Sequence, residues 1–243
     1  MTTGIFDRYW QKVAEAIGNT QSRGHAIRLS KQPPPSFNGT AVVEQLYQAL
    51  DCEDWKSPVG TNWVWRESDD SQYETTSPEV SLEREIVAAA PRGEWTYQLS
   101  TASGIDGGRR AIDLVHRTAP NRYAFIELKV GSDNSLYAAF ELLSYALAYL
   151  HARRNGWQSQ GKYDVMDAHA IDLIILAPED WYIYKDRGGP HHSFDHGWLI
   201  KGLNEGLASL SGSTPSIQIF FESFVNKEDA ARTAEEIISR SSR

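Results

Sequence analysis

Residues 108–150 read GRRAIDLVHRTAPNRYAFIELKVGSDNSLYAAFELLSYALAYL. They decide the fold because charged side chains interrupt segments that otherwise have the patterns of buried strands and a buried helix. Within this stretch, residues 123–130 alternate as a strand does, so that apolar side chains recur on one face. Glu127 and Lys129 therefore share the opposite face. The alternation predicts that their two charged groups lie side by side.

Residues 111–115 form a second strand pattern, and Asp113 breaks its apolar run. A carboxylate in such a run is costly unless a divalent cation or a paired lysine compensates it. Taken singly, each residue has a plainer interpretation: Glu127 and Lys129 as a solvent-facing pair on an edge strand, and Asp113 as a strand-end residue. Taken together, two carboxylates suit a hard cation, and the ammonium beside them could orient or deprotonate a water molecule.

This arrangement resembles the PD-(D/E)XK nuclease superfamily, which has the restriction-endonuclease-like fold. Asp113 falls at the aspartate position, and Glu127-Leu128-Lys129 falls at the (D/E)XK triplet. Ile112 stands where the family name has proline. The resemblance covers about residues 77–221, and its weight lies in the order of the motifs on helix, strand, strand and helix.

Members of this family also carry a glutamate on the helix before these strands. On the helix after them, a polar residue is followed one turn later by a tyrosine. Glu83, Glu141 and Tyr145 match these places, although Glu141 replaces the more usual glutamine, which leaves its role open. In the first helix Glu83 lies within the apolar stripe and Glu85 lies off it; Glu79 shares the stripe one turn earlier and is the second choice.

The resemblance implies a nuclease that hydrolyses phosphodiester bonds in a nucleic acid, with DNA as the expected substrate and Mg²⁺ or Mn²⁺ as cofactor; the residues themselves do not distinguish DNA from RNA. Asp113 and Glu127 would bind the metal ion together with Glu83, directly or through water, and Lys129 would position or activate the attacking water. Glu141 and Tyr145 would support these groups. The alternative is a non-catalytic nucleic-acid-binding or protein-binding subunit built on the same fold. Candidate substrate contacts are Arg109, Arg110, His191, His192 and His196.

Composition bounds the class of protein. The chain has 243 residues, enough for one domain with a full core or for a core with an appendage. The formal charge of −8 argues against a general nucleic-acid coat but allows an enzyme with a local basic groove. Cys52 is the only cysteine, which excludes an intrachain disulfide and a thiolate zinc site. No apolar run approaches the ~18 residues of a membrane helix, so we expect a cytoplasmic protein without membrane contact; a homodimer is compatible with the sequence.

The expected fold class is α/β, with a central mixed sheet flanked by helices. We expect a restriction-endonuclease-like core at residues 77–243, and the last elements of this core should be a helix, a strand and a helix. Residues 1–76 are expected to form a small, mainly helical appendage. Helices are expected at residues 5–17, 41–50, 77–90, 135–153, 198–210 and 228–239. Strands are expected at residues 62–66, 95–100, 111–115, 123–130, 170–177 and 216–221.

Two further clusters have both a functional and a structural interpretation. Trp63 and Trp65 could stack on bases, but aromatic packing is the commoner use of such a pair. The histidines of residues 191–196 could bind a transition metal if they lay on a helix, where His192 and His196 would share a face. The glycines on both sides of this segment favour a loop instead.

Overall fold

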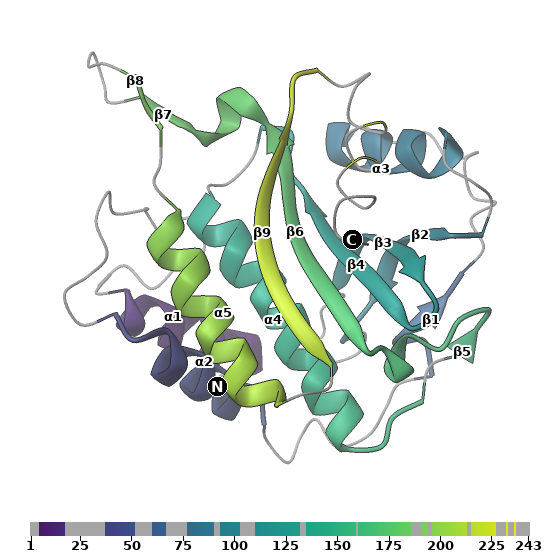
Figure 1. Cartoon of the computed structure of the whole chain (residues 1–243), viewed down its shortest axis with the longest axis horizontal. Helices are drawn as coiled ribbons and strands as arrows, with labels where there is room; N and C mark the ends of the chain where they lie inside the picture. The colour runs from purple at the N-terminus through teal and green to yellow at the C-terminus, as the bar shows by residue number, and fades with distance from the viewer. Residues whose placement is uncertain are drawn as a thin grey trace.

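The computed structural model describes residues 5–17, 37–51, 60–66, 77–89, 93–102, 110–131, 135–158, 160–185, 191–193, 196–212, 215–226, 232 and 236. Its centre is a five-stranded mixed sheet with the order β2-β3-β4-β6-β9 (Figure 1). These strands are β2 (Trp95–Ser100), β3 (Ala111–Ala119), β4 (Arg122–Leu128), β6 (Ala170–Pro178) and β9 (Ser216–Phe224). The predicted α/β class with a mixed central sheet is confirmed.

Strand directions follow from the connections. Strands β2, β3 and β4 pair as antiparallel neighbours, and a two-residue connection at residues 120–121 joins β3 to β4, as antiparallel pairing allows. The helices α4 (Ser135–Arg154) and α5 (Gly197–Ser211) lie between strands β4, β6 and β9, which pair in parallel. Parallel neighbours require such crossovers because the chain must return to the same end of the sheet. The prediction that residues 111–115 and 123–130 belong to adjacent strands is confirmed.

Helices cover both faces of the sheet, but unequally (Figure 1). Helices α4 and α5 pack on one face together with α1 (Ile5–Ala16) and α2 (Gly39–Leu50), within one large apolar cluster. Helix α3 (Pro78–Ala89) covers the other face over a smaller cluster. The side chain of Ser77 accepts a hydrogen bond from the backbone N–H of Val80 at 3.4 Å, as expected of an N-cap.

The two N-terminal helices are part of the main core. The Tyr9 hydroxyl donates a buried hydrogen bond to the Phe140 carbonyl of α4 at 2.6 Å, which ties α1 to the central helix. Helix α2 reaches α5 through glycines: a Cβ on Gly39 would lie only 2.0 Å from the Gly202 carbonyl oxygen. Residues 67–76 and most of the helix expected at 228–239 fall outside the described residues.

The outer edge of β9 is covered by a side chain. The Asn204 side-chain oxygen on α5 accepts from the Ile219 N–H at 2.7 Å, and its amide nitrogen donates to the Ile219 carbonyl at 3.3 Å. One amide thus satisfies both backbone groups of an edge-strand residue, which would otherwise be open to pairing.

Smaller elements complete the fold. Strands β1 (Val64–Trp65) and β5 (Gln160–Gly161) form a short parallel pair. Strands β7 (Ile183–Lys185) and β8 (His191–Ser193) form a short antiparallel pair. Two 3-10 helices, η3 (Val165–Asp167) and η4 (Glu179–Tyr182), precede and follow β6. Trp63 and Trp65 are buried and pack against Tyr149 and Tyr163, so the packing interpretation of the tryptophans is confirmed. Within the described part of the chain, no helix has the length and apolar character needed to cross a membrane.

Candidate active site

Asp113 and Glu127 lie where strands β3 and β4 begin to separate. The ladder between these strands ends at the pair Leu114 and Ile126, so Asp113 and Glu127 are the next residues beyond it. In place of a ladder bond, the Leu128 N–H donates to Asp113 Oδ2 at 2.9 Å. An aspartate that replaces a strand partner in this way fixes its own carboxyl group against the neighbouring strand.

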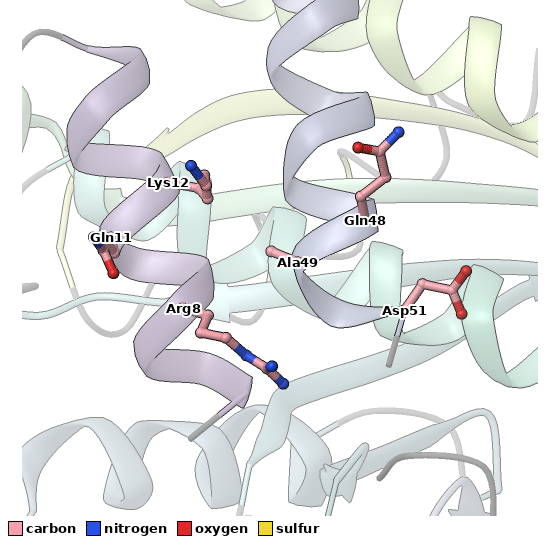
Figure 2. A pocket seen from close by; sticks show the side chains of 6 residues that line it. All are labelled: Arg8, Gln11, Lys12, Gln48, Ala49 and Asp51. Carbon is pink, nitrogen blue, oxygen red and sulfur yellow. The ribbon is translucent and has the colours of Figure 1, made fainter. Parts of the chain in front are cut away.

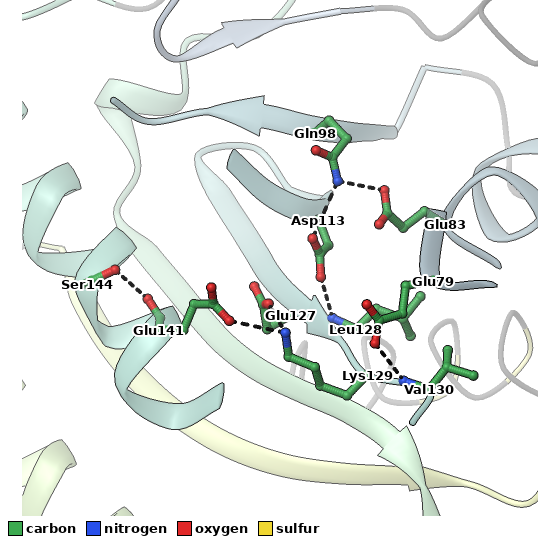
Figure 3. Close-up of polar contacts among 10 residues, drawn as sticks. All are labelled: Glu79, Glu83, Gln98, Asp113, Glu127, Leu128, Lys129, Val130, Glu141 and Ser144. Atoms are coloured by element: carbon green, nitrogen blue, oxygen red, sulfur yellow. Dashed lines mark hydrogen bonds and ion pairs between the residues drawn. The ribbon is translucent and has the colours of Figure 1, made fainter. Parts of the chain in front are cut away.

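Lys129 joins this strand end to helix α4 (Figure 3). Its ammonium lies 2.7 Å from Glu127 Oε1 and 3.1 Å from Glu141 Oε2. The exposed fraction of the Lys129 side chain is only 7%, and that of Glu127 is 4%. The interpretation of Glu127 and Lys129 as a solvent-facing edge pair is therefore wrong, because β4 is an inner strand and the pair is buried.

Helix α3 brings two more carboxyl groups from the opposite face. Glu83 is 1% exposed and points toward Asp113, whereas Glu85 is exposed, as the helical periodicity predicts. Glu79 accepts a hydrogen bond from the Val130 N–H at 3.2 Å, so it caps the backbone just after Lys129. The prediction that Glu83 is buried and Glu85 is exposed is therefore confirmed.

Gln98 on β2 is a site residue that the sequence analysis missed. Its amide nitrogen lies 2.9 Å from Glu83 Oε2 and 3.4 Å from Asp113 Oδ1 (Figure 3). Its φ of 50° is in the left-handed region, which is unusual for a residue other than glycine within a strand. The only signal in the sequence is that a polar amide stands in the strand pattern WTYQLS.

The left-handed backbone at Gln98 changes which face the β2 side chains occupy. Trp95 belongs to the cluster under α3, whereas Leu99 belongs to the cluster under α4. The opposing strand changes in the same way, with Leu114 under α3 and Ile112 under α4. Gln98 and Asp113 lie between these pairs. The candidate site is therefore at the point where the side chains of both strands change from one face of the sheet to the other.

Burial and mutual repulsion raise the pKa values of the acidic groups. Burial, followed by the charge of Asp113, raises the pKa of Glu83 to about 8. Burial raises the pKa of Asp113 to about 7, although Lys129 and the Leu128 N–H both act to lower it. Burial, then Asp113 and Glu141, raises the pKa of Glu127 well above its usual value. The protein fold therefore holds carboxyl groups together at a cost that a nearby cation would relieve.

Lys129 and Tyr145 respond to the same negative charge. Burial alone would lower the pKa of Lys129, but the carboxylates of Glu127, Glu141 and Asp113 outweigh it and raise that pKa above its usual value. Burial, and then Glu127 and Glu141, raise the pKa of the Tyr145 phenol well above its usual value. At neutral pH the site thus contains a charged ammonium and a neutral phenol.

The fit of these residues to a metal ion is partial. In the residues that the structure describes, no three carboxylate, histidine or cysteine side chains come together as a ready ligand set. Glu127 Oε2 is nevertheless buried and accepts no hydrogen bond from any described residue. A buried carboxylate oxygen without a donor is costly, and a cation would satisfy it. The donor set, with oxygen ligands alone, suits Mg²⁺ or Mn²⁺.

The candidate substrate contacts that the structure describes come from different elements of the fold, since Arg110 directly precedes β3 and the histidines belong to β8 or to the start of α5. Arg110 lies over the Phe6 ring at 4.1 Å, and Arg109 falls outside the described residues. His191 and His192 belong to strand β8, so the helix that would pair His192 with His196 for metal binding is absent. The His196 ring stacks on Phe221 at 4.2 Å, next to Tyr182.

A groove of about 480 Å³ lies elsewhere, between α1 and α2 (Figure 2). None of the candidate site residues lines it, and its Lys12 is already paired with Glu15 at 2.6 Å. The lining residues are Arg8, Gln11, Lys12, Gln48, Ala49 and Asp51.

Comparison with known proteins adds no assignment, since no family model, curated protein or solved structure matches this chain. The resemblance to the PD-(D/E)XK superfamily therefore stays a prediction that rests on the motifs and on their placement.

Proposed function

We propose that this protein is a metal-dependent nuclease that hydrolyses phosphodiester bonds in DNA. The observation that carries the proposal is a set of carboxyl groups from one strand pair and two helices, gathered beside a buried ammonium at one end of the strand pair. Lys129 contacts Glu127 of β4 and Glu141 of α4, and the Gln98 amide joins Glu83 of α3 to Asp113 of β3. Structural cores avoid such an accumulation of buried charge, whereas catalytic sites use it.

In this proposal Asp113 and Glu127 hold the metal ion, and Glu83 supports the site from α3. A bound Mg²⁺ would neutralise charge on the scissile phosphate and lower the pKa of a coordinated water. Lys129 has a raised pKa and stays protonated, so it serves as a hydrogen-bond donor and cation rather than as a general base. It can orient the attacking water or contact a phosphate oxygen.

Glu141 and Tyr145 support this arrangement from α4. Glu141 contacts the Lys129 ammonium at 3.1 Å, and its position is fixed by the helix. The Tyr145 phenol stays neutral beside the carboxylates, so it can donate a hydrogen bond to one of them. DNA is proposed as the substrate on the strength of the resemblance alone.

The second candidate is a non-catalytic binding subunit on the same fold. The ion pairs of Lys129 with Glu127 and Glu141 favour it, because a lysine can compensate these carboxylates without any metal ion. The net charge of −8 also favours a protein partner over extended contact with nucleic acid.

Calorimetric titration with Mg²⁺ and Mn²⁺ separates the two candidates. The nuclease should bind the metal ion at millimolar concentration or below and should cleave supercoiled plasmid, linear duplex DNA or both. Asp113→Asn should bind the metal ion more weakly and should cleave neither substrate. Glu85→Gln, on the exposed face of the same helix as Glu83, is the matched control and should behave as the wild type. Absence of metal binding in the wild type would favour the binding subunit.

A further inference from the structure

Gln98 connects elements that the rest of the site leaves separate. Its amide lies between Glu83 on α3 and Asp113 on β3, and Asp113 in turn accepts from the Leu128 N–H on β4. These contacts form one hydrogen-bonded chain from α3 through β2 and β3 to β4 (Figure 3). The chain crosses the sheet at the point where the alternation of β2 and β3 reverses.

The chemistry of the amide fixes the direction of these contacts. A carboxylate accepts hydrogen bonds, so the nitrogen end of the Gln98 side chain must face both acids, and its two N–H groups suffice for one bond to each. The oxygen end in that place would set one more acceptor against the carboxyl oxygens and could donate to neither. The left-handed φ of Gln98 is a strained conformation for this residue, and such strain persists where surrounding contacts hold it.

We propose that Gln98 is a positioning residue that forms a hydrogen-bonded relay from Glu83 to the metal ligand Asp113. In this relay Glu83 holds the Gln98 amide, the amide orients the Asp113 carboxyl group, and Glu83 is not itself a metal ligand. This inference rests on the proposed function for the role of Asp113. The Gln98 amide nitrogen donates hydrogen bonds to Glu83 Oε2 and to Asp113 Oδ1. With Oδ2 held by the Leu128 N–H, both Asp113 oxygens are oriented, and each keeps a second lone pair for a cation.

A double-mutant cycle on Mg²⁺ affinity tests the relay. Groups that orient a metal ligand typically contribute 10–100-fold to metal affinity, so Gln98→Met should weaken Mg²⁺ binding by about that factor, and Glu83→Gln should weaken it as well. The double variant should be no weaker than Gln98→Met alone, because Glu83 has lost its connection. If the two losses multiply, Glu83 binds the metal ion independently and the relay is wrong.

The kinetic signature is a fall in kcat for DNA cleavage at unchanged KM, because Gln98 does not contact the substrate. Raising the Mg²⁺ concentration should restore part of the lost rate in Gln98→Met. A variant whose rate is lost without any change in Mg²⁺ dependence has a merely structural defect, and that result counts against the relay.

A measurement on the metal-free protein keeps the test independent of nuclease activity and of how Gln98→Met folds. The side-chain NH₂ resonances of Gln98 should be shifted from those of exposed glutamines such as Gln48, and Glu83→Gln should move them. Resonances at the position of an exposed glutamine would overturn the relay. If the wild type shows these shifted resonances but binds no Mg²⁺, the proposed function fails while the hydrogen-bonded connection stands.

Discussion

Replacing Lys129 by methionine tests how tightly the centre depends on its buried ammonium. Methionine keeps most of the side-chain length but removes the charge that lies 2.7 Å from Glu127 and 3.1 Å from Glu141. Removal of one partner from a buried ion pair costs about 3–5 kcal/mol, because the remaining charge is left without compensation. We expect the free energy of unfolding to fall by about this amount at pH 8.5.

The loss should be smaller at lower pH. Burial already raises the pKa of Glu127, and removal of the lysine raises it further, so a proton neutralises the carboxylate as the pH falls. Urea unfolding, followed through tryptophan fluorescence at pH 8.5 and pH 6, measures both values. The slope of the unfolding free energy against urea should match that of the wild type, which shows that the unfolded state is unchanged.

Lys12→Met is the matched control for this substitution. Lys12 and Glu15 are only 2.6 Å apart, but their side chains are 46% and 51% exposed, so the loss should stay below about 1 kcal/mol. Glu127→Gln combined with Lys129→Met should recover part of the stability, since the more deeply buried carboxylate is removed and only Glu141, which is 14% exposed, is left without its lysine. If Lys129→Met and Lys12→Met lose the same amount, water reaches the site and the argument from burial is refuted.

Three further predictions concern metal affinity, helix packing and pH. Asp113→Asn should weaken Mg²⁺ binding and abolish cleavage together, whereas Lys129→Ala should abolish cleavage with Mg²⁺ affinity unchanged or higher; equal affinities in calorimetry would show that Asp113 is not a ligand. Gly39→Ala should cost on the order of 3 kcal/mol in urea unfolding, because its new methyl group would meet backbone, while Gly60→Ala, with open space around it, should change little. Burial lowers the pKa of His116 from 6.5 to about 4, so the stability that comes from its neutral form is full above pH 6.5 and is lost as the pH falls toward 4. The difference in unfolding free energy between the wild type and His116→Phe should shift by up to about 3 kcal/mol across that range; a constant difference would mean that the imidazole is solvated.

Simple periodicity predicted most of the elements and part of the site. Alternation along residues 123–130 placed Glu127 and Lys129 together, and the helical wheel of α3 distinguished Glu83 from Glu85. Both predictions succeed because they use only the repeat of a regular element. The parallel pairing of β6 with β4 follows the same logic, because the long apolar helix α4 connects the two strands.

The parts that were missed depend on departures from regular repeats or on distant contacts. Gln98 has a left-handed backbone inside a strand, and no pattern of alternation indicates such a residue. The pairing of β1 with β5 joins residues almost a hundred positions apart, which local sequence does not reveal. The strand at residues 191–193 was expected to be loop, because the glycines before it mask a pairing with β7 that only tertiary structure supplies.

The Asn204 amide has a consequence for how this protein can associate with others. A chain that tried to add itself as a sixth strand beside β9 would find both backbone groups of Ile219 already bonded to a side chain. To pair at Ile219 it would have to displace both of these hydrogen bonds. Growth of the sheet by strand addition is therefore opposed at this residue.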